Sequence, residues 1–264
     1  EVFTRQVIEP RDEAQKKASI PCLEQITDEV SVKVREQYET NPYPRWVKCR
    51  LALKPVLIAE FVDYAGLRLF DPQIREVETP EILIAGCGTG QHSIETGATY
   101  KNSKVLAIDL SKSSLAYANR KTEELGLNNI EYMQGDILNI NKLGRQFDII
   151  ESMGVLHHMD DPIAGWKVLV GCLKSGGLMK IGLYSELARE NIVSIRREIN
   201  DLGLAPCDKD MRFFRDLMTN SEASHHISEQ RFHDFYSLSE FRDLFFHVRE
   251  HRFSLEQIEN FLLE

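Results

Sequence analysis

From residue 81 to residue 185 the chain alternates short apolar runs with longer stretches in which apolar residues recur at helical spacing. The stretches between the runs, such as SSLAYANRKTEELGL and PIAGWKVLVGCLK, predict helices, and Gly126 and Gly176 stand where helix C-caps are expected. Runs that are apolar on both faces and alternate with helices are typical of a parallel sheet covered on both sides. The predicted fold class is therefore α/β, with a doubly wound, mostly parallel sheet. The runs are EILIAG, KVLAIDL, IEYMQGD, FDIIESM and GLMKIGLYS.

Both flanks of this region lack the alternation. Residues 1–37 predict amphipathic helices broken at Pro10 and Pro21, and NPYPRW then holds an extended turn, since two prolines in three residues end a helix. LKPVLIAEFVDYAGLRL predicts another helix. After Ser185 the pattern is again helical, including ELARENIVSIRREINDLGL and most of 206–264. We therefore expect three parts: an N-terminal helical cap (1–70), a core (71–185) and a C-terminal, mostly helical region that covers a substrate (186–264).

Composition narrows the class of protein. The 264 residues carry a net charge of −9 with 42% hydrophobic residues, which is ordinary for a globular protein. An acidic chain is not expected to bind nucleic acid through bulk electrostatics. Five cysteines without a C-x-x-C pair favour reduced thiols and a cytoplasmic location, and no apolar run reaches membrane-spanning length. The start without Met and the helix-like end suggest a fragment of a longer polypeptide; oligomeric state is not indicated.

The turn GCGTGQ follows the first apolar run. Gly86, Gly88 and Gly90 allow a ligand to approach the backbone, and amides at the start of a helix attract negative charge. The dinucleotide fingerprint G-x-G-x-x-G requires a third glycine where this chain has Gln91. The turn therefore disfavours a nicotinamide-linked oxidoreductase, while a purely structural tight turn stays open.

Acidic residues follow two further predicted strands. Asp109 can accept two hydrogen bonds from a ribose diol, although it could also cap the next helix, a role that Ser111 could take instead. Asp136 can receive an adenine amino group while Ile137 packs on the ring, or Asp136 is a plain turn residue. Because the carboxyl ends of parallel strands meet in one crevice, the pattern predicts a ligand with ribose and adenine but no pyrophosphate site.

Five motifs in order carry a family resemblance. ILIAGCGTG, VLAIDLS, MQGDIL, FDIIESMGVLHHMDDP and LKSGGLMKIGLYS resemble class I S-adenosylmethionine-dependent methyltransferases over about residues 80–185. NPYPRW is more loosely similar to segments of methyltransferase domains attached to tetratricopeptide-repeat proteins. The resemblance implies a Rossmann-like core, S-adenosylmethionine as cofactor, and methyl transfer to a small-molecule or protein acceptor. A catalytically inactive, S-adenosylmethionine-binding interaction module is the alternative.

The resemblance also implies roles for individual residues. The glycine turn would line the methionine part of the cofactor, and Asp109 would bind the ribose. One departure is Ile84, because the family usually has an acidic residue there, two positions before the first glycine; we expect another group, from the N-terminal segment, to replace it. The implied cofactor-binding residues are Gly86, Cys87, Gly88, Thr89, Gly90, Asp109, Leu110, Asp136, Ile137, Glu151 and Ser152, the last two lying below the transferred methyl group.

The acceptor side is predicted from the flanks. QYETNPYPRW places aromatic and cationic groups on a stiff turn that could face a cationic sulfonium or a carboxylate, or it only fixes the N-terminal helices. The catalytic candidates are Tyr43, Arg45 and His157, the last as a general base or as packing at a helix start. The residues assigned to the substrate cover are Tyr38, Trp46, Tyr184 and Tyr236.

Histidines near the C-terminus are weaker candidates. His233, Asp234 and Tyr236 precede an N-cap expected at Ser237 or Ser239. His247 and His251 are four residues apart and would share a helix face, but the Glu of H-E-x-x-H is absent and no metal site is predicted. For Arg189, Arg242 and Asp243 the interpretation is ion pairing.

Overall fold

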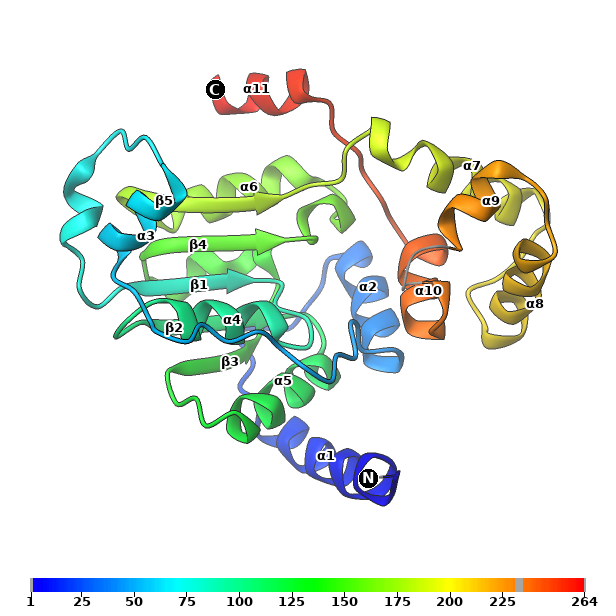
Figure 1. Ribbon diagram of the computed structural model, residues 1–264, viewed down its shortest axis with the longest axis horizontal. Coiled ribbons are helices and arrows are strands. Elements are labelled where there is room, and N and C mark those ends of the chain that lie inside the picture. The colour runs from blue at the N-terminus through cyan, green and yellow to red at the C-terminus, as the bar shows by residue number, and fades with distance from the viewer. Residues whose placement is uncertain (1, 231–234, 264) are drawn as a thin grey trace. The chain divides into compact units, whose positions relative to one another are not determined.

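The computed structural model describes residues 2–230 and 235–263 (Figure 1). The chain forms two compact units, Glu1–Gly182 and Leu183–Glu264. This division lies close to the boundary expected after residue 185, and the N-terminal segment belongs to the first unit. None of the helices in the described ranges is long and apolar enough to cross a membrane.

A five-stranded sheet forms the centre of the first unit. Its order is β3-β2-β1-β4-β5, and every neighbouring pair is parallel, as the alternation predicts. The order reverses between β1 and β4, and such a switch point opens a crevice at the carboxyl ends of the strands. The strands are β1 (Glu81–Ala85), β2 (Lys104–Asp109), β3 (Ile130–Gln134), β4 (Phe147–Met153) and β5 (Leu173–Gly182).

Helices cover both faces of this sheet. Figure 1 shows α4 (Gln91–Thr99) in front of the strands and α6 (Pro162–Gly171) behind them. On the α4 side, Ile82, Ile84 and Ile149 form one apolar cluster with residues of α3 (Ile58–Ala65) and α5 (Lys112–Glu124). The buried strands therefore hold the crevice on a rigid base.

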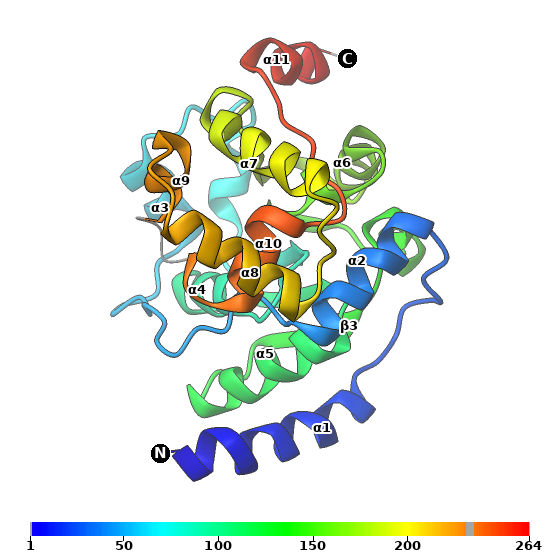
Figure 2. The ribbon, with the colours of Figure 1, turned by 90° about the vertical axis from the view of Figure 1, so that its right-hand side faces the viewer.

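The N-terminal segment packs against the core. A π-helical turn, η1 (Thr4–Ile8), runs directly into α1 (Glu9–Ser19), and α2 (Glu29–Thr40) follows. Pro10 does not break the helical stretch as expected; it lies at the start of α1, directly after the π-helical turn. Helix α1 does end before Pro21. Figures 1 and 2 show α1 running alongside α5.

The second unit is helical, as predicted, and has a core of its own. No strand follows β5 in the described ranges. The helices are η5 (Leu187–Arg189), α7 (Glu190–Asp201), α8 (Asp208–Thr219), α9 (Ser224–Glu229), α10 (Leu238–Phe246) and α11 (Leu255–Leu263). Buried apolar residues join α7, α8 and α10, among them Ile195, Phe214, Phe241 and Phe245.

Two further local predictions are wrong. Helix α6 ends at Gly171, and Gly176 lies inside β5 instead of capping the helix. Its φ of 74° accompanies the register shift between β4 and β5, so the glycine serves an irregular strand. Helix α10 ends at Phe246, which places His247 and His251 beyond it, and they do not share a helix face.

Candidate active site

The glycine turn connects β1 to α4 at the carboxyl edge of the sheet, beside the switch point. Gly86, Gly88 and Gly90 have φ values of 79°, 52° and 84°. A Cβ on Gly86 would lie 2.4 Å from a methyl group of Val155, and the left-handed backbone disfavours any side chain there. The amides of Gly86 and Cys87 donate to the carbonyl of Ile108, at 2.8 and 2.9 Å, which joins the turn to β2.

Asp109 ends β2 beside this turn and is half-buried. Its Oδ2 accepts a hydrogen bond from the amide of Gly88 at 2.8 Å, and its Oδ1 accepts one from the amide of Ser111 at 2.9 Å. Ser111 is the N-cap of α5, with its hydroxyl accepting from the amide of Ser114, so Asp109 is not needed as the cap. Two backbone amides thus orient the carboxylate predicted to bind the ribose.

Burial sets the protonation of this carboxylate. Desolvation raises the pKa of Asp109 to about 6, with a further contribution from the charge of Glu39, although the amide hydrogen bonds oppose the rise. Glu39 of α2 was not a predicted site residue. It accepts from the amide of Lys112 at 2.7 Å and from Lys17 at 2.5 Å. A long-range contact of this kind leaves no local sequence signal.

The predicted adenine side is also built from strand ends. Asp136 is buried, and its Oδ1 accepts from the amide of Leu138, so it caps the short helix η3 (Ile137–Leu143). Ile137 is buried beside it. Leu110 is half-buried, and its carbonyl accepts from the Gln134 side chain at 2.8 Å. These residues lie at the ends of β2 and β3, as the predicted adenine contacts require.

A buried carboxylate lies at the end of β4. Glu151 is 5% exposed, its Oε2 lies 2.7 Å from Nε2 of His92, and the same oxygen accepts a 2.7 Å hydrogen bond from Thr96 Oγ1. His92 and Thr96 are both on α4 and were not predicted. Ser152, the next residue of β4, is fully buried and donates to the carbonyl of Ala85.

The ionisation of Glu151 follows from these contacts. Burial alone raises the pKa of its carboxyl, but His92, Thr96 and the charge of Lys180 outweigh burial and hold the pKa below its ordinary value. Glu151 is therefore a carboxylate at neutral pH. By contrast, burial, with the nearby charge of Asp109, raises the pKa of Cys87 well above its ordinary value, so this thiol in the turn is no nucleophile.

The NPYPRW segment is fastened to the glycine turn. The indole of Trp46 donates to the carbonyl of Thr89 at 3.1 Å, and the Thr89 hydroxyl donates to the carbonyl of Pro44. A Cβ on Gly88 would lie 2.9 Å from the carbonyl oxygen of Tyr43. Trp46 is buried and meets the ring of Tyr117 edge-on. Trp46 thus fastens the N-terminal segment to the core. These contacts fit the alternative in which the NPYPRW segment only fixes the N-terminal helices.

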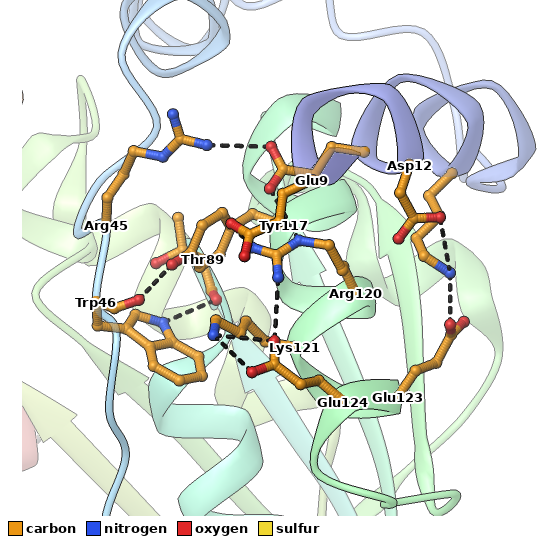
Figure 3. A network of polar contacts seen from close by, with 12 residues as sticks. Glu9, Asp12, Arg45, Trp46, Thr89, Tyr117, Arg120, Lys121, Glu123 and Glu124 are labelled. Carbon is orange, nitrogen blue, oxygen red and sulfur yellow. Dashed lines mark hydrogen bonds and ion pairs between the residues drawn. The ribbon is translucent and has the colours of Figure 1, made fainter. Parts of the chain in front are cut away.

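Arg45 belongs to an ion-pair network on α1 and α5 (Figure 3). Its guanidinium lies 3.1 Å from Glu13 and over the ring of Tyr117. In the same network Arg120 is almost fully buried and contacts Glu13 at 3.0 Å and Glu9 at 3.3 Å. Arg45 is therefore already paired, and these contacts explain it as a fastening of the N-terminal helix.

His157 is fully buried in η4 (Leu156–His158), the short helix after β4. Its ring packs on that of His158 at 4.3 Å. A general base must reach the acceptor's proton, so His157 could serve only after its side chain is uncovered. Its catalytic role stays a prediction.

The remaining aromatic candidates divide between the units. Tyr38 and Tyr43 are half-buried in the first unit. In the second unit, Tyr184 packs under the guanidinium of Arg189 at 4.0 Å, and Tyr236 is 67% exposed. Their cover role stays a prediction; His233 and Asp234 lie outside the described residues. Two minor expectations are confirmed: Ser237 is the N-cap of α10, and Arg189 forms an ion pair, with Glu250 at 2.5 Å.

One cluster in the second unit has the composition of a metal site. Glu198, His225 and His226 place possible ligand atoms within 4.8 Å of one another. The two imidazoles contact separate oxygens of the same carboxylate, at 2.5 and 2.8 Å. Hydrogen bonding alone accounts for this arrangement.

The first unit thus has the architecture of a Rossmann-like domain, with a glycine turn and an acidic strand end at its switch point. Residues 82–177 match a family model described as a methyltransferase domain. Over these residues the chain thus resembles a methyltransferase domain, in agreement with the motifs.

Several known proteins resemble this chain. An uncharacterized protein of Synechococcus sp. is 34% identical over 121 residues, covering 46% of this chain and 29% of that protein. A ubiquinone biosynthesis O-methyltransferase of Coxiella burnetii is 31% identical over 125 residues, covering 47% of this chain and 50% of that protein. PKMT2 from Rickettsia typhi has the same fold, with a TM-score of 0.58 at 20% identity over 74% of this chain and 39% of that one. The structure of its complex with AdoHcy gives a TM-score of 0.54 at 20% identity, covering 73% of this chain and 39% of that one. The chain spans about half or less of the curated relatives it matches.

Proposed function

We propose that the protein transfers a methyl group from S-adenosylmethionine to a small-molecule or protein acceptor. The observation that carries the proposal is Asp109, a carboxylate at the end of β2 oriented by the amides of Gly88 and Ser111 beside the glycine turn. These residues fit an adenosine-containing ligand: Asp109 accepts the ribose hydroxyls, and Ile137 and Leu110 border the adenine. The three glycines adopt the left-handed backbone of the turn, where a Cβ would collide with neighbouring protein atoms.

The bound cofactor supplies a methyl group on a sulfonium, so the protein's task is to bind, orient and exclude water. Hydrogen bonds fasten the turn to β2 and to Trp46, which favours a fixed position for the cofactor. Glu151 and Ser152 border the predicted methionine end. A base is needed only when the acceptor has a proton to lose, and His157 is the candidate for that role.

Other attributes of the protein are part of the same proposal. Its five cysteines are all free, which supports a reducing, cytoplasmic location. The acidic net charge supports an acceptor other than nucleic acid.

Thermal stabilisation by S-adenosylmethionine, S-adenosylhomocysteine and NAD tests the cofactor. A ligand at a hundred times its dissociation constant adds about 2.7 kcal/mol to the free energy of unfolding. We expect a rise in melting temperature with the first two ligands and none with NAD. A rise with NAD alone would overturn the proposal.

Turnover is tested separately, by incorporation of label from methyl-labelled S-adenosylmethionine into fractionated cell extracts. We expect labelled product that disappears when the extract is omitted. Cofactor binding without label in any fraction would instead support the inactive interaction module.

A further inference from the structure

The methionine end of the predicted cofactor site lacks its usual acid. In the family pattern an acidic residue stands two positions before the first glycine, and here that position is Ile84. Ile84 is fully buried in the apolar cluster between the sheet and its helices. No other carboxylate lies on β1 beyond its first residue, Glu81. A substitute on a neighbouring strand would take the place of the N-terminal group expected from the sequence.

The register of the sheet identifies the neighbour. Ile84 of β1 is aligned with Glu151 of β4, and the two strands are parallel. Side chains at aligned positions of adjacent strands project to the same face, and such strands lie about 4.8 Å apart. Glu151 thus lies one strand away from position 84, where the family has its acidic residue. It is at the same height along the sheet and on the same face.

Contacts from α4 hold this carboxylate at the crevice edge. His92 lies in the first turn of α4, directly after the glycine turn, and Thr96 lies one turn later. Both contacts, at 2.7 Å, go to Oε2 of Glu151, and Oε1 takes part in neither. A neutral side chain could also accept from Thr96, whereas the charge of Glu151 is stabilised by His92 and Lys180. A carboxylate is also the group that binds a cation.

We propose that Glu151, positioned by His92 and Thr96, accepts the α-ammonium group of the cofactor's methionine part and replaces the acid missing at Ile84. This inference rests on the proposed function. It makes Glu151 a binding residue, and His92 and Thr96 positioning residues.

The test compares two proteins, wild type and Glu151→Gln in the full chain, in their binding of two ligands. The ligands are S-adenosylhomocysteine and its deamino analogue, which lacks only the ammonium group; binding is measured by titration calorimetry. We expect wild-type protein to bind S-adenosylhomocysteine about tenfold to a hundredfold more tightly than the analogue, the range of one charge-assisted hydrogen bond. In Glu151→Gln this preference should vanish, while the analogue binds as before.

Paired threonine variants separate positioning from folding. Thr96→Val removes a contact to Glu151 and should reduce the preference for S-adenosylhomocysteine severalfold. Thr99→Val is the matched control on the same helix, because its hydroxyl donates only to the carbonyl of Glu95; it should leave the preference unchanged.

Two outcomes overturn the inference: equal affinity of wild-type protein for both ligands, or an unchanged preference in Glu151→Gln. The first needs no variant, so the inference stays testable if Glu151→Gln does not fold. Failure of both ligands to bind wild-type protein contradicts the proposed cofactor itself and is thereby distinguished.

Discussion

Replacing Asp109 by Asn should separate the function of this residue from its effect on stability. A pKa near 6 in the folded chain, against an ordinary value of 3.8, means that the folded state binds more protons than the unfolded state between these pH values. The free energy of unfolding therefore decreases as pH rises through this window. At about 1.4 kcal/mol per pH unit, the decrease attributable to Asp109 is on the order of 3 kcal/mol by neutral pH.

In Asp109→Asn this contribution is removed. The amide side chain carries no charge, but it has one acceptor oxygen for the two amides that Asp109 binds, which costs about 1–3 kcal/mol. The variant should thus be less stable than wild type near pH 4.5, and the wild type should lose about 2 kcal/mol relative to it between pH 4.5 and pH 7.5. Urea unfolding monitored by tryptophan fluorescence suits this measurement, because Trp46 and Trp166 are the chain's two tryptophans and are buried in the first unit.

Ligand binding should show the opposite pH dependence. Ribose hydroxyls donate to the carboxylate, so S-adenosylhomocysteine binds the ionised form, and its affinity for the wild type should fall about tenfold per pH unit below pH 6. Asp109→Asn should bind at least tenfold more weakly at pH 7.5 and show no such dependence. A stability difference that stays constant from pH 4.5 to 7.5 would refute the assignment of the raised pKa. An undiminished affinity would refute the ribose contact.

Four further substitutions test the surroundings of the site. Trp46→Ala should lower the free energy of unfolding by about 3–5 kcal/mol in urea titrations, as for other buried aromatic residues. Arg45 is an exposed ion-pair residue, so Arg45→Ala should cost less than about 1 kcal/mol and leave turnover unchanged. A large loss of turnover in Arg45→Ala would instead support its catalytic role. Gly88→Ala should cost on the order of 1–3 kcal/mol of unfolding free energy for the left-handed backbone. It should also abolish thermal stabilisation by S-adenosylhomocysteine, because the new Cβ meets the Tyr43 carbonyl and disturbs the turn. Retained stabilisation would contradict this close contact between Gly88 and Tyr43. Ser111→Ala should cost about 0.5–2 kcal/mol by loss of the N-cap without changing calorimetric affinity for this ligand, since Asp109 is held by the Ser111 backbone; a weaker affinity would show that the hydroxyl itself matters.

Local sequence patterns predict the sheet and the turn because both depend on short-range properties. Runs such as EILIA and FDIIESM are buried on both faces, and glycines recur where φ is positive. The carboxyl ends of the strands then place Asp109 and Asp136 near one crevice without further information.

Contacts between distant segments could not be predicted in this way. The pairing of Arg45 with Glu13 depends on how α1 packs against α5, and the contact of His92 with Glu151 depends on the register of β4 and on the rotation of α4. Neither leaves a periodic signal. Gly176 shows a limit of another kind: a glycine after a helix predicts a C-cap, but the helix ends earlier and the residue serves an irregular strand.

The structural and functional interpretations of NPYPRW are not exclusive, because the segment is fastened to the turn that is predicted to bind the cofactor. Asp109 holds the amide of Gly88 from β2, and Trp46 donates to the carbonyl of Thr89 from the N-terminal side. The glycine turn is thus fixed from both sides without any ligand, so less conformational entropy remains to be lost on binding. A residue such as Trp46 can therefore influence cofactor affinity without touching the cofactor, through the fraction of molecules in which the turn is already formed.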